Sequence, residues 1–155
     1  MLGEKVGQVY FERAVLGNDW RPLYPVRVEQ CGRRLDVQFH VPVPPLLWDD
    51  ELPAPHQAED GYPEWRLGKG FEVRSGAQAL EIESVEIISD DVVRITCAAA
   101  IPEGAMLGYA ATTDGVKMDG GTVRWGLLRD SDPFVGAVTE VSQPNFSVAF
   151  ELPIE

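Results

Sequence analysis

Cysteine is scarce in this sequence, since Cys31 and Cys97 are the only two among 155 residues. Each stands alone, without the paired spacing that zinc sites show. A bridge between them would stabilise the fold by about 4 kcal/mol in the chain-entropy model, and the sequence leaves open whether they pair. A chain of this length suits one domain, which can bury a core without disulfide or metal staples.

Long apolar runs and basic residues are also scarce. No apolar run approaches the roughly 20 residues of a membrane helix, and the start, MLGEKVGQVYFERAV, is charged where a signal peptide is apolar. Lys and Arg number 13 against 25 Asp and Glu, which gives a net charge of -12. A field of this sign repels phosphate backbones and anionic lipids. We therefore expect a soluble domain with no nucleic-acid or membrane partner, and its cellular location stays unknown.

The motifs of the common catalytic sites are missing. There is no G-x-S-x-G elbow, no Gly-rich phosphate loop and no zinc-spaced histidine pair, and the only histidines are His40 and His56. The strand pattern makes His40 a half-exposed strand residue. We assign the acidic clusters 49–51, 59–60 and 130–132 to turns or solvated surface, although a hydrolase with an acidic pair remains a third alternative. We expect no enzyme activity, no cofactor and no metal ligand, with calcium dependence left open.

One amphipathic helix is predicted at the start of the chain. Apolar residues recur at helical spacing over residues 2–16, and Gly17-Asn18 follows as a stop. No N-cap precedes the pattern, because it begins at the second residue. We therefore interpret 1–17 as a helix that remains from a preceding domain, and 18–155 as a separate β-sandwich domain.

The rest of the chain shows the two-residue period of strands. A β-hairpin is expected around the turn at Cys31-Gly32, and Gly, Pro or Asp separates the later strands. Short strands without intervening helices indicate a mostly β fold, an antiparallel β-sandwich of immunoglobulin-like or jelly-roll-like type. The expected strands are 23–28, 35–41, 71–73, 79–88, 92–98, 106–111, 123–128 and 146–152. The expected core is Val26, Val28, Val37, Phe39, Phe71, Ile82, Val85, Ile87, Val93, Ile95, Leu107, Tyr109, Val148 and Phe150.

The segment from Trp48 to Gly70 shows neither the hydrophobic period of a helix nor that of a strand, and it is predicted to be a long loop. It carries three aromatic residues among polar ones, and flat rings next to hydrogen-bonding groups are typical of sugar sites. The alternative is that these rings cover the core. We favour this alternative for Trp48, because it follows the apolar pair Leu46-Leu47. The candidate carbohydrate-binding residues are Trp48, Asp50, Tyr62, Trp65 and Arg66.

Three strings resemble a known family: GRRLDVQFHVPVPPLLWDD, GLLRDSDP and NFSVAFELPI. They are similar to the region that follows the catalytic domain in phage and prophage proteins of the SGNH-hydrolase, sialate O-acetylesterase-like type. The resemblance implies an all-β module attached to an esterase, with residues 2–10 matching the last helix of the catalytic part. The catalytic blocks of that family are absent, so no catalytic residue is carried over, and the loop 49–70 matches no pattern of the family.

Two functions follow from these observations. The first is a carbohydrate-binding accessory module, which would hold a polysaccharide or oligosaccharide close to a preceding catalytic domain and raise its effective concentration. The second is a structural or assembly module of a phage-like particle or a multidomain esterase, in which the aromatic residues are core. The two differ in whether Tyr62 and Trp65 are exposed. Ligand identity and oligomeric state do not follow from the sequence.

Overall fold

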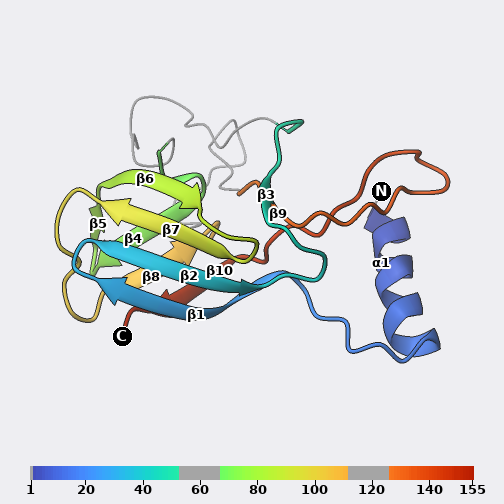
Figure 1. Ribbon diagram of the computed structural model, residues 1–155, viewed down its shortest axis with the longest axis horizontal. Helices are drawn as coiled ribbons and strands as arrows, with labels where there is room; N and C mark the ends of the chain where they lie inside the picture. The colour runs from blue at the N-terminus through green and yellow to red at the C-terminus, as the bar shows by residue number, and fades with distance from the viewer. Residues whose placement is uncertain (1, 53–66, 112–125) are drawn as a thin grey trace.

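A computed structural model of the chain describes residues 2–52, 67–111 and 126–155 (Figure 1). The predicted helix is present as α1 (Leu2–Tyr10), followed by a π-helical turn, η1 (Phe11–Val15), and it ends before Gly17 at a φ of 73°. The strands are β1 (Tyr24–Cys31), β2 (Arg34–His40), β3 (Leu47–Trp48), β4 (Phe71–Ser75), β5 (Gln78–Leu80), β6 (Ile82–Ile87), β7 (Val92–Cys97), β8 (Met106–Tyr109), β9 (Leu128–Arg129) and β10 (Phe150–Pro153).

The first sheet has the strand order β1-β2-β7-β6, and all its neighbours are antiparallel. Its first two strands form the expected hairpin, whose turn places Gly32 at a φ of 62°, a conformation that glycine adopts without strain. The alternation in β2 buries Leu35, Val37 and Phe39 and turns the residues between them outward. The hydrophobic pattern therefore fixes which face of this sheet is covered.

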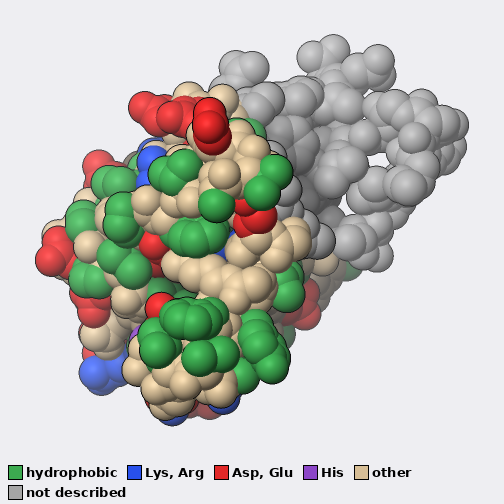
Figure 2. Space-filling model, turned by 90° about the vertical axis from the view of Figure 1, so that its right-hand side faces the viewer, with side chains coloured by type: hydrophobic (Ala, Val, Ile, Leu, Met, Phe, Trp, Pro, Cys, Tyr) green, Lys and Arg blue, Asp and Glu red, His purple; other side chains and the backbone are tan. Residues whose placement is uncertain are grey.

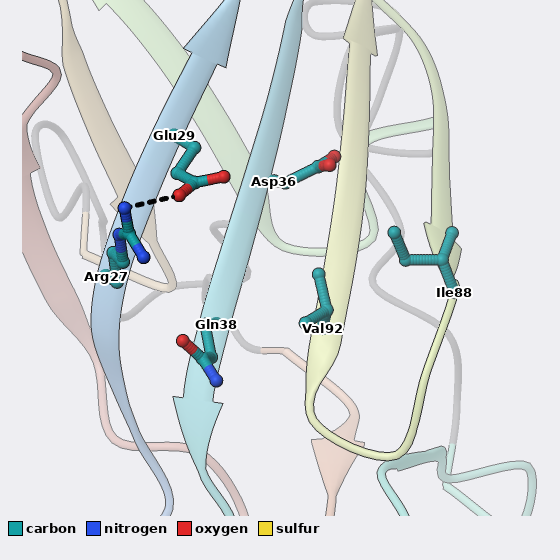
Figure 3. Close-up of a pocket in the computed structure, with 6 residues that line it drawn as sticks. All are labelled: Arg27, Glu29, Asp36, Gln38, Ile88 and Val92. Atoms are coloured by element: carbon teal, nitrogen blue, oxygen red, sulfur yellow. Dashed lines mark ion pairs between the residues drawn. The ribbon is translucent and has the colours of Figure 1, made fainter.

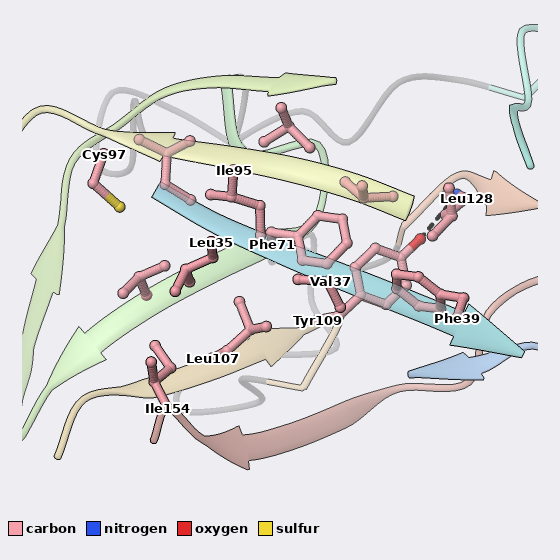
Figure 4. Close-up of a cluster of buried hydrophobic side chains, with 14 of the residues drawn as sticks. Leu35, Val37, Phe39, Phe71, Ile95, Cys97, Leu107, Tyr109, Leu128 and Ile154 are labelled. Carbon is pink, nitrogen blue, oxygen red and sulfur yellow. Dashed lines mark hydrogen bonds between the residues drawn. The ribbon is translucent and has the colours of Figure 1, made fainter. Parts of the chain in front are cut away.

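The second sheet has the order β10-β8-β4-β5 and faces the first across a shared apolar core (Figures 1 and 4). Tyr109 is central to this core: its ring lies 4.7 Å from that of Phe71 and 5.6 Å from that of Phe150, centroid to centroid. Its buried hydroxyl accepts a hydrogen bond of 2.9 Å from the backbone N–H of Leu128. The expected antiparallel β-sandwich is confirmed, and a third, two-stranded sheet pairs β3 with β9.

Two residues of the expected core are exposed instead. The side chain of Val26 is 51% exposed because β1 carries an irregularity between Pro25 and Arg27, which shifts the pairing register. Val148 is 39% exposed because the last strand is shorter than predicted and begins only at Phe150. The other members of the expected core are buried or pack against it.

The helix stands to one side of the sandwich, and the segment that follows β9 extends out to it (Figure 1). Within this segment Val135 pairs with Ser142 in an isolated antiparallel bridge. We call residues 134–143 the hairpin loop. No helix among the described residues has the length and apolar character needed to cross a membrane.

Candidate functional site

Trp48 and Asp50 are the two candidate residues that the structure describes. Trp48 lies in β3, is partly buried and packs against the core, as the alternative for this ring anticipated. The ammonium group of Lys69 lies 4.7 Å from the centroid of its ring, within the range of a cation–π contact. Asp50 is exposed two residues further along. The indole ring is thus fixed by its neighbours while part of its surface remains accessible.

Asp49 separates these two residues and turns inward. Its carboxylate is 2.9 Å from Nε of Arg129 in the paired strand β9. The same carboxylate accepts hydrogen bonds from the backbone N–H groups of Glu51 and Leu52, at 3.1 and 2.9 Å, as in an Asx turn. Asp49 therefore sets the direction in which the chain leaves β3, and the exposed neighbour is the better candidate for a ligand contact.

The other three candidates, Tyr62, Trp65 and Arg66, lie outside the described residues. The described chain stops at residue 52 and resumes at residue 67, shortly before β4. Their part in ligand binding therefore stays a prediction.

Asp130 is the centre of a buried polar corner after β9. It has no exposed surface. Its Oδ1 accepts hydrogen bonds from the backbone N–H groups of Asp132 and Asn145, and its Oδ2 from the N–H of Val43 and from Nδ2 of Asn145. These four donors come from three segments of the chain. The predicted structural turn is present here, and a solvated surface position is wrong for this acidic cluster.

The polar side of helix α1 is turned toward the corner and the hairpin loop. The carboxylate of Glu4 accepts hydrogen bonds from the backbone N–H of Val138 at 2.7 Å, from Oγ1 of Thr139 at 2.7 Å and from Nε2 of Gln143 at 3.1 Å. These hydrogen bonds, the one from Thr139 above all, lower the pKa of Glu4 from 4.5 to about 2. These three donors of the hairpin loop therefore keep the carboxylate of Glu4 in its charged form.

A second set of contacts joins the helix to Asp132. Lys5 donates to Oδ2 of Asp132 at 2.8 Å, and Gln8 donates to the same oxygen at 3.2 Å. Burial alone would raise the pKa of Asp132, but the hydrogen bonds, led by the one from Lys5, lower it below its usual value. The corner is thereby connected to the helix through a charged pair that is largely shielded from water.

The apolar side of the same helix is turned outward. Figure 2 views this end of the molecule and shows hydrophobic side chains gathered on it. Amphipathic helices normally cover a core with this side, so the orientation here is the reverse of the usual one. We name the exposed surface the helix–hairpin face. It consists of Val6, Tyr10, Phe11 and Val15 of α1 and η1, of Leu16 directly after them, and of Val135, Val138 and Val141 of the hairpin loop.

His40 is the one described histidine. As expected, it is a half-exposed residue at the end of β2, and its ring lies 5.4 Å from that of Tyr24 in β1. Within the described ranges no group of three His, Cys, Asp or Glu side chains is arranged to hold a metal ion. His56 lies outside the described residues.

Comparison with known proteins identifies solved structures of similar fold. No family model matches the sequence, and no curated protein matches it. Among solved structures, the chain is similar to XAC1771, a novel carbohydrate acetylesterase from Xanthomonas citri, with a TM-score of 0.55 at 12% identity. The match covers 96% of this chain and 27% of that chain, so this chain spans about a quarter of the acetylesterase.

The N-terminal part of the bacterial S-layer protein SbsC is also similar, with a TM-score of 0.45, 13% identity and coverage of 96% of this chain and 26% of that chain. At these identities the likeness concerns the fold alone. A fold of this kind thus occurs over about a quarter of a carbohydrate acetylesterase, which agrees with the accessory-domain character expected from the sequence.

Proposed function

We propose that the chain is a non-catalytic carbohydrate-binding accessory module of a phage or bacterial carbohydrate-active enzyme of the SGNH-hydrolase type. The observation that carries this proposal is the partly accessible ring of Trp48, fixed by the core and Lys69 beside the exposed Asp50. The similarity in fold to part of a carbohydrate acetylesterase supports it.

The chemistry of these groups suits a sugar. The C–H faces of a sugar ring pack on an indole, and a carboxylate accepts hydrogen bonds from hydroxyl groups. In the proposal Tyr62 and Trp65 extend the aromatic surface, and Arg66 donates to hydroxyl or carbonyl oxygens. All five groups belong to β3 or to the sequence between β3 and β4.

Retention on insoluble cellulose, chitin and xylan, followed by a glycan array with and without calcium, tests the proposal. Trp48→Ala and Asp50→Ala should weaken any retention, and Trp65→Ala and Tyr62→Ala should weaken it further. Trp20→Ala removes a half-buried indole elsewhere and serves as the matched control. The Asp50 variant matters because Trp48→Ala also removes core contacts. Retention that none of the four substitutions changes, in folded variants, would contradict the proposed site.

The non-catalytic part of the proposal is tested separately. We expect no turnover of acetylated sugars or of small chromogenic esters. Turnover that disappears in His40→Ala or His56→Ala would show that the chain is itself an esterase.

The helix–hairpin face favours a second candidate, a structural module that docks against a preceding domain of the same polypeptide or against another chain of an assembly. Large apolar side chains exposed together at one end of a molecule are typical of interaction sites, and the inward hydrogen bonds of Glu4 and Lys5 hold this end in place. The chain should enhance the fluorescence of a hydrophobic dye, and Val6→Glu with Val138→Glu should remove that signal without unfolding the protein. Dye binding with no glycan retention would favour this candidate over the first.

A further inference from the structure

The outer face of the sheet β1-β2-β7-β6, turned away from the core, is hollowed. The hollow measures about 290 Å³. Figure 3 shows that the side chains around it project from neighbouring strands of the sheet. It is lined by Arg27, Glu29, Asp36, Gln38, Ile88 and Val92.

The lining has an apolar part and a polar part. Val92 pairs with Gln38 across the sheet, and Ile88 follows β6 beside it, so the two apolar side chains lie together. Arg27 pairs with Gln38 on the other side and adds a donor. Sugar rings combine C–H patches with hydroxyl groups that both donate and accept, and this mixture of surfaces fits them.

Asp36 and Gln38 are held by partners before any ligand arrives, and Nε2 of Gln38 donates to Oδ2 of Asp91 at 3.0 Å. Arg27 pairs with Glu29 at 2.6 Å. Both oxygens of Asp36 receive hydrogen bonds from Arg94, at 2.8 and 2.7 Å, which lower the pKa of Asp36 and keep it an ionised acceptor. A carboxylate has about four acceptor positions, so each of these oxygens can accept one more hydrogen bond. Such prior positioning reduces the entropy that a ligand must overcome.

The two carboxylates that line the hollow are paired, in a chain that carries a net charge of -12. Each carboxylate of the lining has an arginine partner: Glu29 has Arg27, and Asp36 has Arg94. Asp91, which accepts a hydrogen bond from Nε2 of Gln38 at 3.0 Å, adds a negative charge beside the hollow, and the field of the whole chain also repels anions. A neutral ligand is the best match.

The outer face continues beyond the hollow to a pair of rings. Asp36, Gln38 and His40 alternate along β2 and share this face, and Tyr24 of β1 pairs with His40. The centroids of the Tyr24 and His40 rings are 5.4 Å apart. Because His40 follows Gln38 by two residues on the same face of β2, the rings lie about 7 Å along the strand from the hollow. A volume of about 290 Å³ is at the lower limit of small-molecule sites, so an oligosaccharide seated in the hollow would extend beyond it toward the rings.

We propose that this outer face is a second binding surface for a neutral oligosaccharide, with Arg27, Asp36 and Gln38 contacting the hydroxyl groups and Tyr24 stacking on the adjacent residue. The inference rests on the proposed function, carbohydrate binding, and adds a site on the opposite side of the first sheet from the core. It is independent of Trp48 and of the residues between β3 and β4.

The test is titration of the 15N-labelled chain with cellohexaose, xylohexaose, mannohexaose and chitohexaose in turn, with hexagalacturonate as the anionic comparison. At least one neutral sugar should shift the backbone amides of β1, β2 and β7, and hexagalacturonate should not. Arg27→Ala and Gln38→Ala should each raise the Kd about tenfold, the effect of losing a good hydrogen bond. Arg33→Ala removes another exposed, ion-paired arginine, bonded to Glu83, and should leave the Kd unchanged.

The outcomes separate the two binding proposals. Binding that Trp48→Ala abolishes, but that Arg27→Ala and Gln38→Ala leave intact, keeps the proposed function and overturns this second surface. Binding with the opposite sensitivity supports the second surface and moves the function away from β3. If no neutral hexasaccharide shifts the sheet amides at millimolar concentration, the second surface is overturned, whatever the polysaccharide retention shows.

Discussion

Lys5 and Asp132 form an ion pair of 2.8 Å across 127 residues of sequence, and it joins the helix to the polar corner. The side chains are only 18% and 8% exposed, so water screens this pair less than a surface pair. Asp132 belongs to the corner that Asp130 and Asn145 complete. The position of the helix therefore depends on the same buried network that shapes the end of the sandwich.

Replacing Lys5 with methionine should loosen this connection. Lys5→Met keeps most of the aliphatic stem but leaves Asp132 with fewer donors, so we expect the free energy of unfolding to fall by about 1–2 kcal/mol. Hydrogen exchange in α1 should accelerate more than exchange in β2 or β7. Arg21→Ala removes an exposed pair with Asp19 and should change little. Equal effects of the two substitutions in urea unfolding would contradict the importance of the buried pair.

Strand periodicity in the sequence was sufficient for most of the sandwich, because each face of a half-buried strand has a distinct composition. The alternation in β2 predicted its buried residues Val37 and Phe39 correctly. The same rule failed at Val26, since a local register shift changes the face of a residue without leaving a mark in the sequence.

The orientation of the helix was not predictable in the same way. Its amphipathic pattern indicates a helix with two faces, but not which face meets the rest of the chain. Glu4 and Lys5 find their partners more than a hundred residues away, in the hairpin loop and in the polar corner, whose own shapes depend on tertiary contacts. The outer-face hollow is likewise a product of strand order, since it joins Arg27 to Val92 through three neighbouring strands.

Asp130→Ala should be strongly destabilising. The substitution leaves four donors in a buried environment without their acceptor, and we expect a loss of at least about 3 kcal/mol in the free energy of unfolding. Asp130→Asn should lose less, because one side-chain oxygen remains. Asp50→Ala is the exposed control, with little effect expected. The melting temperature should be the same in calcium and in a chelator, whereas calcium-dependent melting that Asp130→Ala abolishes would make the corner a metal site.

Acid should protonate Glu4 and weaken its hydrogen bonds to the hairpin loop. The pKa of this carboxyl is lowered in the folded chain. Its contribution to the free energy of unfolding is therefore fully present above pH 4.5 and is lost as the pH falls from 4.5 toward about 2. The amide of Val138 donates to this carboxylate, and its chemical shift should report the change with a midpoint near the lower value. Glu4→Gln should abolish the titration. A midpoint near 4.5 would mean that the helix does not hold this contact in solution.

The two cysteines should differ sharply in reactivity. They are not joined to each other: Cys31 is exposed and Cys97 is completely buried, and both are free thiols. Burial, with a smaller contribution from Glu83, raises the pKa of Cys97 from 9.0 to about 11. Because the thiolate is the reactive form, iodoacetamide in mildly alkaline buffer should modify Cys31 alone, and Cys97 only in denaturant.

The raised pKa of Cys97 also links stability to alkaline pH. The thiol ionises more readily in the unfolded chain than in the folded chain. The contribution of Cys97 to the free energy of unfolding is therefore fully present below pH 9.0 and is lost as the pH rises toward about 11. Urea unfolding across this interval should show a decline that is smaller in Cys97→Ala than in Cys31→Ala, although Cys97→Ala is less stable at neutral pH because it leaves a cavity. Rapid labelling of both thiols in the folded chain would contradict the burial of Cys97.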